Sequence, residues 1–250
     1  MAQTILLFGG SGKVARHLTK QLSSAGHTVH SIIRKSSQAP DVESLGGNPI
    51  IQSIEDSSVA DMAATMTSTA ATAIVWSAGA GGGNPDRTTA VDRDGAIRSM
   101  DAAAQAGVRR YVMVSAIDIR DREGKPEPEW YDDADRERSE GMWGAIGHYA
   151  NMKLAADRSL VTENGRRGLE WTIVRPTGLS EGAGMGRVEA GKVHLSRRVS
   201  REDVASVVVE CLRNEGTKGL AFDVVGGETG IEEAVERVAR ERVDTFEGRY

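Results

Sequence analysis

Tyr149 and Lys153 have the residue types and the spacing to do chemistry together. In a helix, a spacing of four residues puts both side chains on one face, one turn apart. A free tyrosine titrates at about pH 10, and a nearby ammonium group favours the phenolate and lowers that pKa. Such a pair could exchange a proton with a substrate near neutral pH. A Tyr–Lys pair at this spacing also arises by chance, so the prediction needs support from other residues.

Ser115 is a candidate third member of this group. It follows the apolar run Tyr111–Val114, which has the composition of a buried strand. In open α/β sheets, ligands bind at the carboxyl ends of the strands, so a hydroxyl there could hydrogen-bond a substrate oxygen. A serine at a strand end is more often only a turn residue. The hypothesis therefore depends on all three residues occurring in order.

A glycine turn follows the first apolar strand, Thr4–Phe8, and precedes a helix expected over Lys13–Ala25. The free N–H groups and the dipole at such a helix N-terminus bind an anion. The spacing Gly9-x-x-Gly12-x-x-Ala15 differs by one register from the dinucleotide fingerprint. We predict nucleotide binding here; the alternative is an ordinary strand-to-helix turn. The expected cofactor-binding residues of the turn are Gly9, Gly10, Ser11, Gly12, Lys13 and Val14.

The end of the second strand, Thr28–Ile33, indicates which dinucleotide binds. In NAD sites an acidic residue near this point holds the ribose 2′-hydroxyl. Here Arg34 and Lys35 follow the strand, and no carboxylate occurs until Asp41. Two cations suit a 2′-phosphate, so we predict NADP (NADPH) as the cofactor. The alternative is that both side chains are merely solvated surface.

Strands and helices alternate along the chain, which predicts an α/β fold with a Rossmann-type doubly wound parallel sheet flanked by helices. We expect one domain over 1–250, with a cofactor half at about 1–115. The catalytic helix and a small C-terminal substrate-binding portion would follow at about 116–250. The further strands expected are Pro49–Gln52, Ala73–Trp76, Tyr111–Val114, Trp171–Val174 and Ala221–Val225. The further helices expected run from a cap at Asp56 or Ser57 towards Met66, over Asp92–Ala106, from about Ser139 to Asn164, from the cap Ser200 to about Asn214, and over Ile231–Arg240.

Three connecting segments also carry expectations. Ser77–Gly83 follows the fourth strand, and its small residues would let the backbone approach the cofactor at Ser77, Ala78 and Gly79, unless the segment is only a flexible loop. The charged, proline-bearing Asp118–Asp135 should be an exposed excursion. The glycine-rich Thr177–Gly191 has few apolar residues to hold it rigid, so we expect a loop that covers the substrate and becomes ordered when cofactor and substrate bind. Asp92 should only begin a helix, without a chemical role.

Composition excludes several classes of partner. The formal net charge of −5, with both signs interspersed, argues against nucleic acid. No apolar stretch approaches the ~20 residues of a membrane span, and we see no leader pattern. The single Cys211 lies in an apolar helical run, which predicts a buried thiol and a reducing, cytoplasmic location. The five histidines have no metal-ligand spacing, so we expect no metal.

The sequence resembles a known superfamily in the order of its motifs. Gly9–Ala15 (GGSGKVA), Ser115 and Tyr149-x-x-x-Lys153 occur as in the short-chain dehydrogenase/reductase superfamily. The glycine pattern, Arg34, WTIVRPTGL (Trp171–Leu179) and SREDVA (Ser200–Ala205) resemble its atypical, NmrA-like NAD(P)-binding branch. The resemblance implies that Ser115 polarises a carbonyl, that Tyr149 is the general acid, and that Lys153 binds the nicotinamide ribose and tunes Tyr149.

One position departs from that branch. The branch commonly has Gly-Asp after its third strand, where the aspartate contacts adenine, whereas this chain has Gln52-Ser53. Ser53 could therefore give only a neutral contact. Ile54 and Pro176, which follow the third and sixth strands, are the remaining cofactor-binding residues that the resemblance implies.

We therefore expect an NADP-dependent oxidoreductase that passes a hydride between nicotinamide and a carbonyl/alcohol pair of a small-molecule substrate. Two alternatives stay open. One is a non-catalytic NADP(H)-binding redox sensor, because the branch contains proteins with degraded catalytic residues. The other is an epimerase or isomerase whose cofactor is reduced and reoxidised within one turnover. Substrate identity, reaction direction and oligomeric state do not follow from the sequence.

Overall fold

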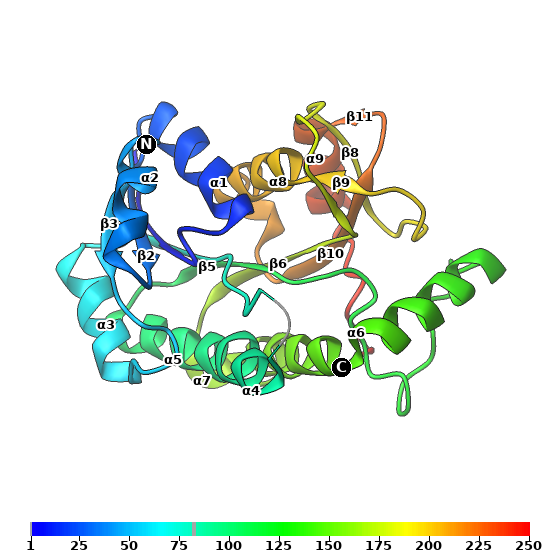
Figure 1. The fold of residues 1–250 in the computed structure, drawn as a ribbon. Helices are drawn as coiled ribbons and strands as arrows, with labels where there is room; N and C mark the ends of the chain where they lie inside the picture. The colour runs from blue at the N-terminus through cyan, green and yellow to red at the C-terminus, as the bar shows by residue number, and fades with distance from the viewer. Residues whose placement is uncertain (1, 82–83) are drawn as a thin grey trace.

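The computed structural model describes residues 2–81 and 84–250 and has a nine-stranded central sheet (Figure 1). Its strands are β1 (Thr4–Phe8), β2 (Thr28–Ile33), β3 (Asn48–Ile51), β4 (Ala73–Trp76), β5 (Arg110–Val114), β6 (Glu170–Pro176), β8 (Arg187–Gly191), β10 (Leu220–Gly226) and β11 (Thr229–Gly230). Their order is β11-β8-β10-β6-β5-β4-β1-β2-β3. Strands β1 to β6 and β10 run parallel, and β8 is antiparallel to its neighbours.

Helices cover both faces of this sheet. The helices are α1 (Lys13–Ser24), α2 (Ala39–Glu43), α3 (Val59–Ser68), α4 (Pro85–Thr88), α5 (Ala96–Ala106), α6 (Asp133–Thr162), α7 (Asn164–Arg167), α8 (Arg201–Arg213) and α9 (Ile231–Glu241). Helices α1, α8 and α9 lie on one face, and α3 to α7 lie on the other (Figure 1). The mostly parallel sheet with flanking helices confirms the predicted Rossmann-type α/β fold. Within the described residues, no helix has the length and apolar character needed to cross a membrane.

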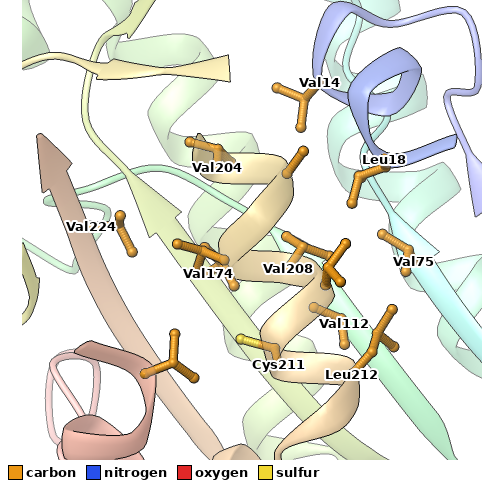
Figure 2. Packing of buried hydrophobic residues seen from close by; sticks show 14 of the residues in the cluster. Val14, Leu18, Val75, Val112, Val174, Val204, Val208, Cys211, Leu212 and Val224 are labelled. Atoms are coloured by element: carbon orange, nitrogen blue, oxygen red, sulfur yellow. The ribbon is translucent and has the colours of Figure 1, made fainter. Parts of the chain in front are cut away.

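The apolar face of α8 shows how a helix is held on the sheet. Val204 and Val208 point from α8 towards the valines of β5, β6 and β10, and α1 packs alongside (Figure 2). Cys211 lies on the same face and is fully buried, as predicted. Burial raises the pKa of its thiol to about 12, so it behaves as a small apolar side chain. Ser200 caps the helix, as predicted, because its hydroxyl accepts the N–H of Asp203 at 2.9 Å.

Most expected elements are present, with shifted ends. The third strand begins one residue earlier than predicted, at Asn48, and Ser58 rather than Asp56 or Ser57 caps the next helix. The predicted helix Asp92–Ala106 is wrong at its start. There the chain forms α4 and then a π-helical segment, η2 (Thr89–Gly95), before α5 begins.

Helix α6 begins at Asp133 instead of near Ser139. The carboxylate of Asp132 caps it by accepting the N–H of Asp135 at 2.8 Å. Inside α6, Ile146 has non-helical dihedral angles (φ −130°, ψ 24°), which kink the helix. The part before the kink projects beyond the layer of helices (Figure 1).

The segment predicted as an exposed excursion is anchored by a buried carboxylate. Asp118 is 1% exposed and accepts hydrogen bonds from Arg120 Nε at 2.8 Å and from Tyr131 Oη at 3.2 Å. Ser139 and Trp143 of α6 donate to the same carboxylate. The prediction holds for residues 123–127, which are exposed, and is wrong at Asp118 and Arg120, whose charges are satisfied by each other rather than by water.

The glycine-rich segment Thr177–Gly191 is also better ordered than its composition suggests. It contains β7 (Leu179–Ser180), which pairs with β9 (Val199–Ser200), as well as β8, whose Val188 is fully buried. The backbone N–H groups of Met185 and Gly186 donate to the carboxylate of Asp203 at 3.0 and 2.8 Å. Asp203, in the first turn of α8, therefore anchors a segment that has few apolar residues, and its role in covering the substrate stays a prediction.

Gly9 is required by both its conformation and its surroundings. Its φ is +80°, and an added Cβ would lie 2.6 Å from Ala78 Cα. We expect Gly9→Ala to lower the free energy of unfolding by about 1–3 kcal/mol, because it combines backbone strain with a clash. Urea unfolding would measure the loss. Gly26→Ala is the matched control, since Gly26 has φ +83° but nothing within 4 Å of an added Cβ. An equal loss in both variants would contradict the argument from the clash.

Candidate cofactor and active site

The glycine turn joins β1 to α1 at the carboxyl edge of the sheet. Gly12 is the N-cap of α1, and within the described residues no side chain bonds to this cap. The first turn of α1 contains no acidic residue. Its N–H groups and dipole are therefore left for an anion, as expected for a pyrophosphate site. No side chain fits at Gly9 or Gly10, because a Cβ added to either residue would lie within 2.6 Å of a neighbouring atom.

Two adjoining cavities open from this turn. The first, here the Arg34 cavity, lies beside the ends of β2 and β3, and the second, here the Tyr149 cavity, lies beside the end of β5. The predicted residues lining the Arg34 cavity are Gly9, Ser11, Gly12, Arg34, Ile54, Ser77, Ala78 and Gly79. Those lining the Tyr149 cavity are Gly12, Lys13, Val14, Ser77, Ala78, Gly79, Ser115, Tyr149, Lys153 and Pro176. The four residues common to both sets join the cavities into a groove that suits the two halves of a dinucleotide. The predicted Ser77–Gly83 stretch also includes residues 82–83, which lie outside the described residues.

Three predicted residues do not line either cavity. Gly10 packs on Ser31 of β2 instead. Lys35 follows Arg34 in a loop held by Gln38, whose side-chain oxygen accepts the N–H of Lys35 at 2.9 Å. Ser53 turns away to donate its hydroxyl to Asp56 at 2.7 Å. Sequence reasoning missed the residues that line the Arg34 cavity in addition to those predicted, which are Ile32, Ile33, Gln38, Gln52, Glu55, Arg87 and Val91.

Glu55 brings a carboxylate to the predicted 2′-phosphate site. Its Oε1 lies 3.6 Å from Arg34 Nη1 and 2.7 Å from Arg87 Nε. The sequence shows no acidic residue near the end of β2, but the loop after β3 supplies one from the neighbouring strand. The signal that could have found Glu55 is this adjacency, since β2 and β3 end at the same sheet edge.

Ser115 ends β5 and is 5% exposed. Its backbone N–H donates to Val174 of β6 at 2.8 Å, which fixes the position of the residue. Its hydroxyl donates to Asp157 Oδ2 at 2.5 Å. Asp157 lies on α6 and had no role in the sequence analysis, although it follows Lys153 by the same four-residue spacing as Lys153 follows Tyr149.

Tyr149 and Lys153 lie together on α6 after the kink, with Lys153 Nζ 5.8 Å from the centre of the Tyr149 ring. Burial raises the pKa of Tyr149, and the Lys153 ammonium opposes this only in part. The expectation that the lysine brings the phenol towards neutral pH is thus not met by the protein groups alone. The phenol stays protonated at neutral pH, which is the form that can donate a proton.

Asp92 holds Lys153 in place, although the sequence suggested no chemical role for it. Asp92 is 1% exposed, and its Oδ1 lies 3.3 Å from Lys153 Nζ. Its Oδ2 accepts the N–H of Ala80 at 2.9 Å. Burial lowers the pKa of Lys153, but Tyr149 and Asp92 outweigh that effect and raise it. The π-helical turn η2 carries Asp92, and π-turns of this kind are common at functional sites.

The described residues contain one group of His and carboxylate side chains close enough together to hold a metal ion, Asp132, Asp135 and His194. None of them lines either cavity. His194 Nδ1 lies 2.6 Å from Asp135 Oδ2, and the N–H of Leu195 donates to Asp135 Oδ1 at 2.7 Å. These contacts hold the loop after β8 to the start of α6.

Known proteins match this chain along most of its length. A family model described as NAD(P)H-binding matches residues 9–215. The chain is 38% identical over 231 residues to UPF0659 protein C216.03 of Schizosaccharomyces pombe, with 92% of each chain covered. It is 32% identical over 236 residues to a Bacillus subtilis protein named uncharacterized sugar epimerase YhfK, with 94% of this chain and 99% of that one covered. The solved structure of the oxidoreductase ylbE from Lactococcus lactis has a TM-score of 0.78 and 26% identity, and the match covers 95% of this chain and 97% of that one.

The family model begins at Gly9, the first residue of the turn that opens the groove, and extends past the site residues on β5 and α6. The family match supports a nicotinamide cofactor for this chain. The chain belongs to the NAD(P)H-binding family.

Proposed function

We propose that this protein is an NADP-dependent oxidoreductase that transfers a hydride between nicotinamide and a carbonyl/alcohol pair of a small molecule. The observation that carries the proposal is the Tyr149 cavity, where Ser115, Tyr149 and Lys153 meet beside the glycine turn. The oxidoreductase ylbE, whose fold this chain shares, supports the reaction class. The motif order also supports membership of the short-chain dehydrogenase/reductase superfamily, in its NmrA-like branch.

Each residue has a distinct role in this proposal. The glycine turn and the start of α1 hold the pyrophosphate, and Arg34 binds the 2′-phosphate. NADPH bound in the groove would supply the hydride. Tyr149 donates its phenolic proton to the carbonyl oxygen, and Ser115 hydrogen-bonds that oxygen. Lys153 holds the nicotinamide ribose and stabilises the phenolate that remains.

The same proposal includes the expected division of the chain, the roles of Ser53 and Lys35, the kind of substrate and the location. Residues at about 1–115 would hold the cofactor, and those at about 116–250 would supply the catalytic helix and the substrate-binding portion. Ser53 and Lys35 would contribute only after a change of side-chain orientation. A small molecule as the substrate and a cytoplasmic location stay predictions.

A screen of carbonyl compounds tests the reaction. The protein is mixed with NADPH and each compound, and loss of absorbance at the reduced nicotinamide band is followed. Net oxidation of NADPH supports the proposal. The name of the Bacillus subtilis relative favours a second candidate, an epimerase acting on a sugar. An epimerase would invert a sugar stereocentre without net change of the cofactor, so the same assay with product analysis separates the two reactions.

Cofactor choice is a prediction of its own. We expect NADPH to bind more tightly than NADH by about 1.5–3 kcal/mol, roughly 10- to 150-fold in Kd, because Arg34 offers charge-assisted hydrogen bonds. Calorimetric titration of both nucleotides measures the difference. Arg34→Glu should remove the preference, whereas Arg16→Glu, which changes a cation outside the Arg34 cavity, should keep it. Equal affinities in the wild type would contradict the prediction.

Glu55 refines this expectation. Its carboxylate would repel a 2′-phosphate, but two guanidinium groups, those of Arg34 and Arg87, face it. Glu55→Gln should therefore increase the preference for NADPH in the same titration.

A further inference from the structure

Asp157 is a buried carboxyl group that the proposed reaction does not use. It lies on α6, one turn after Lys153 and two turns after Tyr149, and it is 0% exposed. Its side chain does not line the Tyr149 cavity. The hydroxyl of Ser115, which does line that cavity, is its hydrogen-bond partner at 2.5 Å. Asp157 therefore touches the candidate site only through Ser115.

Asp157 also has no cation of its own within the described residues. Lys153 lies 3.3 Å from Asp92, and Arg175 of β6 lies 3.0 Å from Asp223 of β10. Within the described residues, Asp157 forms no ion pair, and its Oδ1 is buried without a hydrogen-bond partner. A buried carboxylate in this situation is costly, which favours the protonated form.

The two protonation states of Asp157 have opposite effects on Ser115. A serine hydroxyl has one proton to donate. When Asp157 is ionised it can only accept, so the Ser115 proton is committed to it. When Asp157 is protonated, its own O–H can donate to Ser115 Oγ, and the Ser115 proton is free to turn into the cavity.

We propose that Asp157 is a positioning residue whose protonation state decides whether Ser115 directs its hydroxyl proton at the carboxyl group or into the Tyr149 cavity. Protonation of Asp157 takes up one proton from solvent and forms one O–H bond, while the Ser115 O–H bond is kept and its hydroxyl only reorients. Under the proposed function, on which this consequence rests, only the second arrangement lets Ser115 donate to a substrate carbonyl oxygen.

The charged and titratable groups around Asp157 come from three elements. Tyr149 and Lys153 face it from α6, Arg175 from β6, and Tyr111 from β5. Burial raises the pKa of Asp157 to about 6, although Ser115, Arg175 and Lys153 all act to lower it. The pKa of Tyr149 lies above its usual value of 10.0, so Asp157 is the member of this group expected to titrate between pH 5 and 8.

The first experiment needs no turnover. The full chain is labelled at its aspartate carboxyl carbons, and the Asp157 signal, assigned by its loss in Asp157→Asn, is titrated by NMR. Ser115→Ala removes the donor that favours ionised Asp157, so we expect the pKa of Asp157 to rise by about one unit, a tenfold higher proton affinity. An unchanged pKa in Ser115→Ala overturns the proposal, whatever the protein is found to catalyse.

The second experiment measures kcat against pH with NADPH and the best carbonyl compound of the screen. In the wild type, kcat should fall about tenfold for each pH unit above 6, as the free Ser115 proton is lost. Asp157→Asn carries an amide that does not titrate in this pH range and whose NH2 group can donate to Ser115 Oγ. Its profile should therefore be flat from pH 5 to 8, and at pH 8 its kcat should exceed that of the wild type by tenfold or more.

Two other outcomes distinguish this proposal from a purely structural role of Asp157 and from a failure of the proposed function. A role of Asp157 in structure alone would lower kcat of Asp157→Asn equally at all pH values, and that result would overturn the inference. If the wild type reduces no carbonyl compound, the proposed function fails, and the NMR titration alone decides whether Asp157 and Ser115 are coupled.

Discussion

Tyr149→Phe should lower turnover by about 10²–10⁴-fold and leave NADPH affinity nearly unchanged. The variant removes the phenolic proton that would reach the substrate oxygen. It keeps the ring, so the contact with Lys153 and the lining of the cavity persist. Steady-state kinetics gives the loss of kcat, and calorimetry gives the NADPH affinity.

Tyr131→Phe is the matched control for this variant. Tyr131 is buried, its hydroxyl donates to Asp118, and the residue does not line the Tyr149 cavity. We expect its loss to be that of one hydrogen bond, about 0.5–1.5 kcal/mol of stability, with turnover largely kept. Full turnover in Tyr149→Phe would exclude the phenol as the acid. A sensor would show no turnover in the wild type and different effects of NADP⁺ and NADPH on partner binding.

Asp92→Ala should have the largest effect on stability, lowering the free energy of unfolding by about 3–5 kcal/mol. The substitution leaves Lys153, whose side chain is 4% exposed, as a buried cation without its partner. It also removes the acceptor of the Ala80 N–H. Urea unfolding at neutral pH measures the loss, and turnover should fall with it because Lys153 is no longer held.

Two further variants make this prediction specific. Asp94→Ala is the control on the same π-helical segment, because Asp94 forms an exposed pair with Arg93, and it should change stability by less than about 1 kcal/mol. Lys153→Met in the Asp92→Ala background should recover part of the lost stability, since no buried charge then remains unpaired. A double variant that is less stable than Asp92→Ala would show that the buried charge is not the cause.

The sequence predicts well those parts of the fold whose structure is determined by residues adjacent in the chain. Strand β1, the glycine turn and α1 are adjacent in the chain, and each has its own periodic or turn signal. The same holds for Ser200, which caps a helix that begins at the next residue. The spacing of Tyr149 and Lys153 is likewise a property of one helix.

The missed residues act across elements that lie far apart in the chain. Asp92 of η2 pairs with Lys153 of α6, and Asp157 of α6 accepts a hydrogen bond from Ser115 at the end of β5. Neither contact leaves a local pattern, because an aspartate in a charged helix has the same appearance whether it is solvated or buried. The start of the segment predicted as exposed is missed for this reason, since the buried Asp118–Arg120 pair is satisfied inside the protein.

The kink at Ile146 divides α6 into two lengths of helix, and both lengths contribute residues to the Tyr149 cavity. Met142, from the length before the kink, lines the cavity, while Tyr149 and Lys153 lie in the length after it. A change of side chain before the kink can reshape the cavity wall without altering the register of the proton donor and its lysine. Under the proposed function, substrate choice and proton chemistry would lie on separately adjustable parts of the helix, and a library directed at the first length would be the route to variants with new substrate ranges.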